Sequence, residues 1–153
     1  MSTLAPMTLS PEGLALLKRY EACSLVIYDD QAGLPTIGWG HLIVKGENFA
    51  KGITEAEAEI LLHKDLAPRV AAVNACLEVV ITQAQFDSCV SLLFNIGEKN
   101  FRKSSFLRAV NSKASNDIIR SSLKMWRKVT VNGAKVNSAG LMNRRADEAK
   151  AWP

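Results

Sequence analysis

The chain has 153 residues, of which 48% are apolar, 7% aromatic and 22% charged, and its formal net charge is +4. This composition is typical of one soluble globular domain, and it excludes disordered, collagen-like and disulfide-scaffold proteins. No apolar run approaches the roughly 18 residues that span a membrane, and residues 1–9 lack the basic and apolar regions of a signal peptide. We therefore expect a protein that folds in a reducing cytoplasm.

The cysteines form no pattern that binds a metal or builds a disulfide framework. The chain contains Cys23, Cys76 and Cys89, an odd number without C-x-x-C spacing. Cys89 falls on an apolar helical stripe, where cysteine acts as a small buried hydrophobic residue. The sequence accordingly predicts neither a metal site nor a cofactor.

The charge is distributed unevenly along the chain. Residues 1–76 carry six Lys and Arg against nine Asp and Glu, a balance of −3, whereas residues 77–153 carry thirteen against six, a balance of +7. A basic half of this kind either keeps the protein in solution or attracts a polyanionic partner. The basic residues show no aromatic interleaving and no nucleic-acid motif, so no nucleic-acid partner is expected.

The first predicted helix covers residues 11–21, with Ser10 as the N-cap and Pro11 in the first helical position. At 100° per residue, the leucines of this helix and Glu21 share one arc of roughly 160°. A Glu that faces leucines is partly desolvated, which favours the protonated form that a general acid needs. The alternative is a side chain at the helix end that bends out into water.

A β-hairpin is predicted over residues 25–41, because a β-branched and aromatic run is followed by a turn and a second run. Alternation of faces and a five-residue loop place Asp30 and Thr36 nearly opposite one another. Together a carboxylate and a hydroxyl can hold a water. Two carboxyl groups, one kept protonated and the other ionised by their different environments, are typical of glycoside hydrolysis. The alternative is that Asp30 only caps its own turn.

The rest of the chain has a helical pattern. A capping box at Thr54 begins a helix over residues 55–76, which Pro68 is expected to kink or split. A second capping box at Thr82 begins a helix that ends at Gly97. Further helices are expected over residues 104–112, 116–127 and 139–151, and a turn or short hairpin over 129–137.

The segment from Glu21 to His41 carries a long and specific pattern. Glu21 is followed after eight residues by Asp30 and after five more by Thr36, which precedes Ile-Gly-x-Gly-His. Two further pieces are Phe94-Asn95-Ile96-Gly97 and Gly140-Leu141-x-x-Arg144-Arg145-x-x-Glu148. Over about residues 10–152 these motifs resemble the phage lysozyme or endolysin family, glycoside hydrolase family 24, and most of all its members from lambdoid phages of Gram-negative hosts.

The resemblance implies an α+β, lysozyme-like fold in which residues 1–153 form a single bilobal catalytic domain. Residues 22–54 are expected to form a small β-hairpin lobe and residues 55–76 the interlobe helix. Residues 77–153 are expected to form the larger helical lobe, packed with the N-terminal helix. The implied activity is that of an N-acetylmuramidase, which hydrolyses the β-1,4 bond between N-acetylmuramic acid and N-acetylglucosamine in peptidoglycan and so lyses the bacterial host.

The resemblance also assigns the reaction to three residues. Glu21 takes the position of the general acid. Asp30 takes the position of the carboxylate that, with Thr36, directs a water to the anomeric carbon in an inverting displacement. Asp29, although adjacent, is off-register and is expected at the surface. Ala22 and Ser24 depart from the Gly and the basic residue that relatives commonly carry there, which affects the local geometry and the pH optimum.

Further positions match the cleft of the family or support it. The residues that match saccharide contacts are Leu42, Phe94, Asn95 and, only loosely, Ser105. Core packing is the alternative for Leu42 and Phe94. Arg144 or Arg145 falls where a family arginine pairs with the catalytic Glu, the alternative being a solvated basic pair. His41 is expected to be structural and to pair with Asp65.

Peptidoglycan is thus the implied partner of a monomer that is made in the host cytoplasm and acts in the periplasm. Residues 1–9 are too short for the N-terminal membrane anchor of some relatives, so we expect no stable anchor. We expect the protein to reach the wall through a separate membrane lesion, such as one made by a holin. Two alternatives remain. A lytic transglycosylase needs the acid but no water-directing pair, and a basic membrane-disrupting module needs neither.

Overall fold

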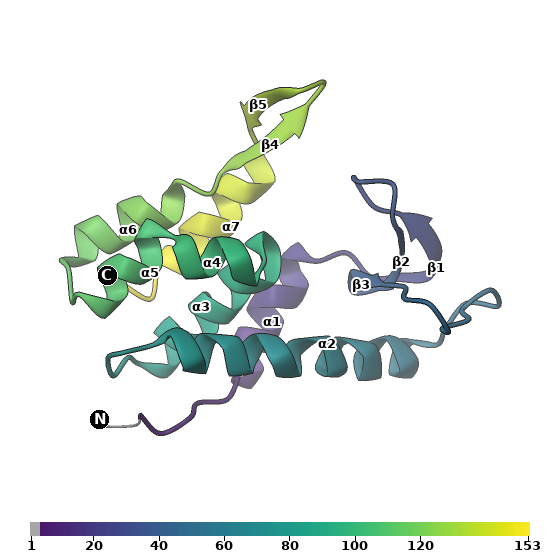
Figure 1. The fold of residues 1–153 in the computed structure, drawn as a ribbon, viewed down its shortest axis with the longest axis horizontal. Coiled ribbons are helices and arrows are strands. Elements are labelled where there is room, and N and C mark those ends of the chain that lie inside the picture. Colours follow the sequence, from purple (N-terminus) through teal and green to yellow (C-terminus); the bar gives the residue numbers. More distant parts are fainter. Residues whose placement is uncertain (1–3) are drawn as a thin grey trace. The chain divides into compact units, whose positions relative to one another are not determined.

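Helices predominate in the computed structural model, which describes residues 4–153, and the strands form two small sheets (Figure 1). The helices are α1 (Pro11–Tyr20), α2 (Glu55–Cys76), α3 (Gln83–Ile96), α4 (Glu98–Lys103), α5 (Ser105–Asn111), α6 (Asn116–Lys124) and α7 (Ala139–Ala149). The strands are β1 (Ser24–Asp29), β2 (Pro35–Gly38), β3 (His41–Leu42), β4 (Lys128–Val131) and β5 (Ala134–Asn137). The expected α+β fold is confirmed.

Two of the sequence expectations concern membranes and export. Residues 1–3 belong to the N-terminal stretch for which no signal peptide is expected, and they lie outside the described residues. Within residues 4–153, no helix combines the length and the apolar character that crossing a bilayer requires.

The chain divides into two compact units. One is Leu17–Pro68, and the other consists of the residues up to Leu16 together with Arg69–Pro153. We call them the strand unit and the helical unit. Their boundaries fall inside α1 and α2, so each of these helices contributes residues to both units.

The strand unit holds an antiparallel sheet in the order β1-β2-β3. Its core is formed by fully buried apolar side chains from α1, β2 and the first half of α2, namely Leu17, Ile37, Ala58 and Leu62. The N-terminus of α2 has the predicted capping box. The backbone N–H of Glu57 donates to Thr54 Oγ1 (3.1 Å), and the backbone N–H of Thr54 donates to Glu57 Oε2 (2.8 Å).

Helix α2 is not split at Pro68. A proline inside a helix removes one N–H donor and leaves the carbonyl of the fourth preceding residue, here Lys64, without its helical partner. Both Lys64 and Pro68 are exposed, so water can reach that carbonyl. Solvent access therefore reduces the cost of keeping the helix continuous.

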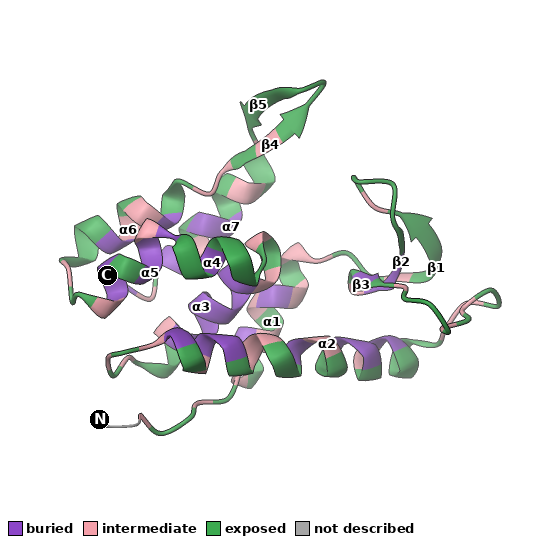
Figure 2. Cartoon of the chain, viewed as in Figure 1, coloured by how far each residue is buried: buried purple, intermediate pink, exposed green. Residues whose placement is uncertain are grey.

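The helical unit is built around α3, in which eight consecutive residues, Phe86–Leu93, are buried (Figure 2). The predicted capping box at Thr82 and the C-cap at Gly97 are both confirmed. Edge-to-face contacts join Phe106 to Phe101 (6.3 Å between ring centroids) and to Trp152 (5.4 Å). These rings connect α4, α5 and the C-terminal segment in one apolar core.

The structure corrects the expected elements at two places. Helix α4 was not expected, because Gly97 predicts the end of a helix. In the structure Gly97 has a positive φ of 87°, the chain turns there, and α4 begins at the next residue. Helix α6 ends at Lys124 rather than residue 127, because the chain continues into β4. The expected hairpin over 129–137 is confirmed, with Asn132 and Gly133 both at positive φ in the turn.

Gly13 in α1 has a packing role that leads to a stability prediction. A Cβ at Gly13 would lie 2.5 Å from Cγ of Asp87, a buried side chain that accepts hydrogen bonds from the backbone N–H and the hydroxyl of Ser10. We therefore expect Gly13→Ala to displace Asp87 and to lower the free energy of unfolding by about 1–3 kcal/mol in urea denaturation.

Gly140 provides the matched control for that substitution. It lies in the first turn of α7, is exposed, and a Cβ there would meet only Ser138 Oγ at 3.8 Å. Gly140→Ala is expected to raise the free energy of unfolding by up to about 1 kcal/mol, since Ala favours the helix. Equal effects at the two glycines would contradict the role assigned to Gly13.

Candidate active site

Glu21 stands at the end of α1, in the strand unit. Its backbone N–H donates to the carbonyl of Leu17 (3.1 Å), so the residue continues the last helical turn, and its side chain is half-buried. A Cβ at Gly40 would lie 3.9 Å from Oε2 of Glu21. Gly40 has a φ of 82°, and the turn between β2 and β3 thus passes close to the carboxylate.

The register of the hairpin differs from the expected one. Thr36 pairs with Tyr28, and Asp29 with Pro35, so Asp30 does not lie opposite Thr36. The loop is tighter than expected, because the backbone N–H of Asp30 donates to the carbonyl of Leu34 (2.9 Å). Since side chains alternate along a strand, Asp30, Tyr28 and Thr36 still share one face, with Asp30 placed diagonally to Thr36.

The polar groups of Asp30 and Thr36 are held by their own loop. Oδ1 of Asp30 accepts from the backbone N–H groups of Ala32 (2.8 Å) and Leu34 (2.9 Å). The buried hydroxyl of Thr36 donates to the carbonyl of Leu34 (2.9 Å). Oδ1 of Asp30 therefore caps the turn. These two hydrogen bonds do not involve Oδ2, which can accept a hydrogen bond from another group. The proton of Thr36 is engaged as well, so its oxygen serves as an acceptor.

Tyr28 lies on the same face of the hairpin as Asp30, and the sequence did not single it out as a site residue. Burial raises the pKa of its hydroxyl, and the negative charges of Glu21 and then Asp30 raise it further. Tyr28, Glu21 and Asp30 all belong to the strand unit. The signal in the sequence was its position two residues before Asp30, which puts it on the same face.

His41 makes the expected contact with Asp65 and a second contact that was not expected. Its Nδ1 lies 2.8 Å from Oδ2 of Asp65, and its Nε2 lies 3.0 Å from Oε1 of Glu47. Burial opposes the charge on the ring, but the hydrogen bonds with Glu47 and Asp65 outweigh it and raise the pKa of His41. Glu47 also accepts from the backbone N–H of Val44, which anchors the loop after β3.

Asp65→Asn is expected to lower the pKa of His41, because one of the two negative charges beside the ring is removed. Because the pKa of His41 is higher in the folded protein than in the unfolded chain, where it is about 6.5, protonation of His41 stabilises the fold fully below that pH. This stabilisation is lost as the pH rises through the pKa of His41 in the folded protein. The variant should lose part of that pH dependence. NMR titration of the His41 ring protons measures the shift, and an unchanged titration would remove Asp65 from this role.

Four of the five predicted residues of the helical unit lie on α3 and α7, and Ser105 lies on α5. Nη2 of Arg144 donates to the carbonyl of Ser91 (3.1 Å), and Nη1 of Arg145 donates to Oδ1 of Asn95 (2.9 Å). Both arginines are buried and contact the fully buried Glu148, from Arg145 Nε at 2.5 Å and from Arg144 Nε at 3.8 Å. The basic pair is thus not solvated, and Glu148 is the carboxylate to which the sequence assigned no role.

The pKa of the Glu148 carboxyl depends on its burial and on the two arginines beside it. Burial raises the pKa of the carboxyl, and the adjacent guanidinium groups, first that of Arg145, counteract the rise. A charge buried to this extent is retained only where it is paired.

The remaining cleft candidates differ in exposure. Leu42 is 47% exposed, which disfavours core packing as its role, whereas Phe94 is half-buried under the guanidinium of Arg69, 4.8 Å from the ring centroid. Asn95 is exposed. Ser105 is half-buried, and its hydroxyl lies 3.9 Å from the sulfur of Met125, while the neighbouring Ser104 caps α5.

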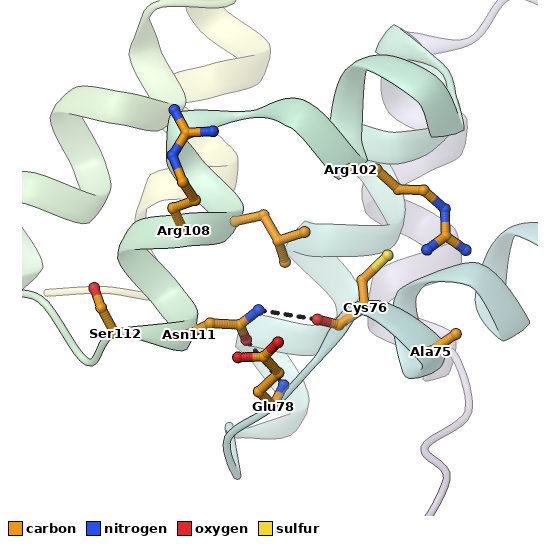
Figure 3. A pocket seen from close by; sticks show the side chains of 8 residues that line it. Ala75, Cys76, Glu78, Arg102, Arg108, Asn111 and Ser112 are labelled. Atoms are coloured by element: carbon orange, nitrogen blue, oxygen red, sulfur yellow. Dashed lines mark hydrogen bonds between the residues drawn. The ribbon is translucent and has the colours of Figure 1, made fainter.

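An open hollow of about 590 Å³ lies elsewhere on the helical unit (Figure 3). None of the residues predicted from the sequence as site residues lines it. Asn111 in its wall donates to the carbonyl of Cys76 (2.9 Å) and accepts from the backbone N–H of Glu78 (2.9 Å), so it caps the end of α2. Asn111 thus joins α5 to the end of α2 beside the hollow. Within residues 4–153 no cluster of His, Cys, Asp and Glu has the makeup of a metal site.

Comparisons with known proteins show the family of the chain. The family model described as phage lysozyme matches residues 18–148. An endolysin of Acyrthosiphon pisum secondary endosymbiont phage 1 is 38% identical over 146 residues, which cover 93% of this chain and 95% of the relative. An endolysin of Salmonella phage P22 is 40% identical over 110 residues, covering 70% and 75%.

The fold is similar to solved structures as well. The structure of an endolysin from Escherichia coli O157:H7 phage FAHEc1 superposes with a TM-score of 0.86 at 39% identity, covering 97% of this chain and 94% of the other. The family match spans most of the chain, including both candidate carboxylates. The chain belongs to the phage lysozyme family.

Proposed function

We propose that the chain is an endolysin that hydrolyses the β-1,4 bond between N-acetylmuramic acid and N-acetylglucosamine in peptidoglycan, with Glu21 and Asp30 as its catalytic residues. Membership of the phage lysozyme family supports the substrate and the glycosidase activity. The observation that carries the proposal is that one unit holds both Glu21, which the Gly40 turn approaches, and Asp30, which shares a face of the hairpin with Thr36. An inverting glycoside hydrolase uses two carboxyl groups that flank the scissile bond and leave room for a water.

In the proposed reaction Glu21 donates its proton to the glycosidic oxygen, so that the leaving sugar departs as an alcohol. A water donates one hydrogen bond to Oδ2 of Asp30 and one to Oγ1 of Thr36, and Asp30 takes the first of these protons as the water attacks. This leaves a lone pair of the water directed at the anomeric carbon. The attack proceeds without a covalent intermediate and inverts the configuration at that carbon.

The other predicted residues receive supporting roles in this proposal. Leu42, Phe94, Asn95 and Ser105 contact saccharide. His41, held by Asp65 and Glu47, fixes the strand that follows the Gly40 turn. The positive balance of +7 in residues 77–153 attracts the free carboxylates of the stem peptides.

We propose further that the whole chain acts as one bilobal catalytic domain and as a monomer. It is made in the host cytoplasm, reaches the wall in the periplasm through a holin-type membrane lesion, and lyses the cell there.

Clearing of purified, lipid-free peptidoglycan tests the proposed function. We expect the protein to reduce the turbidity of the suspension and to release new reducing ends, because hydrolysis leaves a hemiacetal on each cleaved strand. A protein that permeabilises anionic vesicles but releases no glycan fragments would instead be a non-enzymatic membrane-disrupting module.

A further inference from the structure

Trp39 lies in the turn between β2 and β3 and has a glycine on either side. Gly38 has a φ of 65° and Gly40 a φ of 82°, a backbone conformation that other residues rarely adopt. Glycine also loses more conformational freedom on folding than any other residue, so two glycines make this turn costly to hold in one conformation. The half-buried side chain of Trp39 is the group between them whose contacts can fix the turn.

The position of this turn matters because it lies against Glu21. A Cβ at Gly40 would lie 3.9 Å from Oε2 of the Glu21 carboxylate. On the other side of Trp39, a Cβ at Gly38 would lie 3.6 Å from Cδ1 of Ile53 and 3.7 Å from Cβ of Ala58, in the strand unit. One glycine thus rests on packed side chains and the other faces the carboxylate, so a change in the turn alters the surroundings of Glu21.

Lys18 of α1 holds the ring of Trp39. Its Nζ lies 5.3 Å from the ring centroid, a cation–π contact of the kind for which tryptophan is the best partner. The same ammonium donates to Oε2 of Glu59 (2.6 Å), and this hydrogen bond lowers the pKa of Glu59, which keeps the carboxylate ionised. The Lys18 side chain is 28% exposed. The ion pair therefore restrains a long side chain that is otherwise free to point into water.

Lys18 precedes Glu21 by three residues, and side chains at this helical spacing are neighbours. We propose that Lys18 clamps Trp39 and so holds the turn against the carboxylate of Glu21. Lys18 and Trp39 are then positioning residues for proton donation, and Glu59 holds the clamp in place. With the clamp removed, a smaller fraction of the molecules has the acid oriented for the glycosidic oxygen, and the rate falls accordingly. This inference rests on the proposed role of Glu21.

Lys18→Met tests the clamp, because methionine keeps the apolar stem and removes the charge. A partly exposed cation–π contact shifts an equilibrium only several-fold. We therefore expect kcat on purified glycan strands to fall about 3- to 10-fold with KM unchanged. Lys18→Arg should restore kcat, since a guanidinium stays charged, pairs with a carboxylate and stacks on an aromatic ring. The melting temperature should change little in either variant, as is usual for an exposed ion pair.

Lys51→Met is the matched control. Lys51 is an exposed lysine of the same unit, and its substitution removes the same charge. Its kcat and KM should equal those of the wild type. Wild-type kinetics in Lys18→Met overturns the inference. An equal loss in both variants, or a loss confined to KM, also overturns it, because the charge would then attract the substrate rather than position the acid. A wild-type protein without activity would contradict the proposed function instead.

Two further measurements test whether Lys18 acts through Trp39. Trp39→Leu removes the aromatic ring, so the loss in the double variant with Lys18→Met should be smaller than the product of the two single losses. Losses that multiply overturn the inference. Independently of activity, the backbone ¹⁵N–¹H resonance of Gly40 should shift in Lys18→Met and stay in place in Lys51→Met. An unshifted Gly40 resonance in Lys18→Met would show that the turn does not depend on the clamp, and would overturn the inference as well.

Discussion

Glu21→Gln is expected to lower the rate of peptidoglycan hydrolysis about 10²- to 10⁴-fold while the protein stays folded. Gln has the same length as Glu, and the backbone bond from residue 21 to Leu17 is independent of the side chain. An amide, however, has no proton to transfer to the glycosidic oxygen, so the leaving sugar would have to depart as an alkoxide. The initial rate of turbidity loss, with circular dichroism as a check on folding, measures the effect.

Glu12→Gln is the control for this experiment. Glu12 is an exposed carboxylate in the first turn of the same helix, and its substitution changes the net charge by the same amount. Its hydrolysis rate should equal that of the wild type. Near wild-type activity in Glu21→Gln would show that another group supplies the proton.

Asp30→Asn is expected to lower the hydrolysis rate by a similar factor, about 10²- to 10⁴-fold. Asn keeps an Oδ1 that can accept from the backbone N–H groups of Ala32 and Leu34, so the turn should persist. The second oxygen is replaced by an NH₂ group, which cannot accept a proton from the attacking water. Release of reducing ends from purified peptidoglycan measures the loss.

Asp29→Asn provides the comparison. Asp29 is exposed and pairs with Pro35, so its side chain lies on the opposite face of the strand from Asp30. Its rate should be that of the wild type. If Asp30→Asn retained full bond cleavage, Asp30 would serve only as the cap of its turn.

The sequence predicted most elements, because their ends carry local signals. The capping boxes at Thr54 and Thr82 and the Asn132-Gly133 turn each act within a few residues, and all three are present. Pro68 shows the limit of such rules: its effect depends on whether water reaches the freed carbonyl, and that is a tertiary property. Helix α4 was missed for a similar reason, since one glycine both ends α3 and begins the next helix.

The site was predicted less completely than the fold. Shared faces along the hairpin placed Asp30 and Thr36 together, but the loop bond between Asp30 and Leu34 shifted the pairing to Tyr28. Glu47 and Glu148 received no role, because nothing in their local sequence distinguishes a paired carboxylate from a solvated one. Their partners come from the packed structure, in which Glu47 contacts His41 and the fully buried Glu148 must be paired.

The central claim is that water, directed by Asp30 and Thr36, displaces the leaving sugar in one step. Real-time ¹H NMR of the digestion of purified glycan strands tests it most directly, because the anomeric protons report the configuration of the first product. Inversion at the β-linked carbon predicts that the α anomer of N-acetylmuramic acid appears first. Initial formation of the β anomer, or of a 1,6-anhydro end as a lytic transglycosylase leaves, would contradict the account.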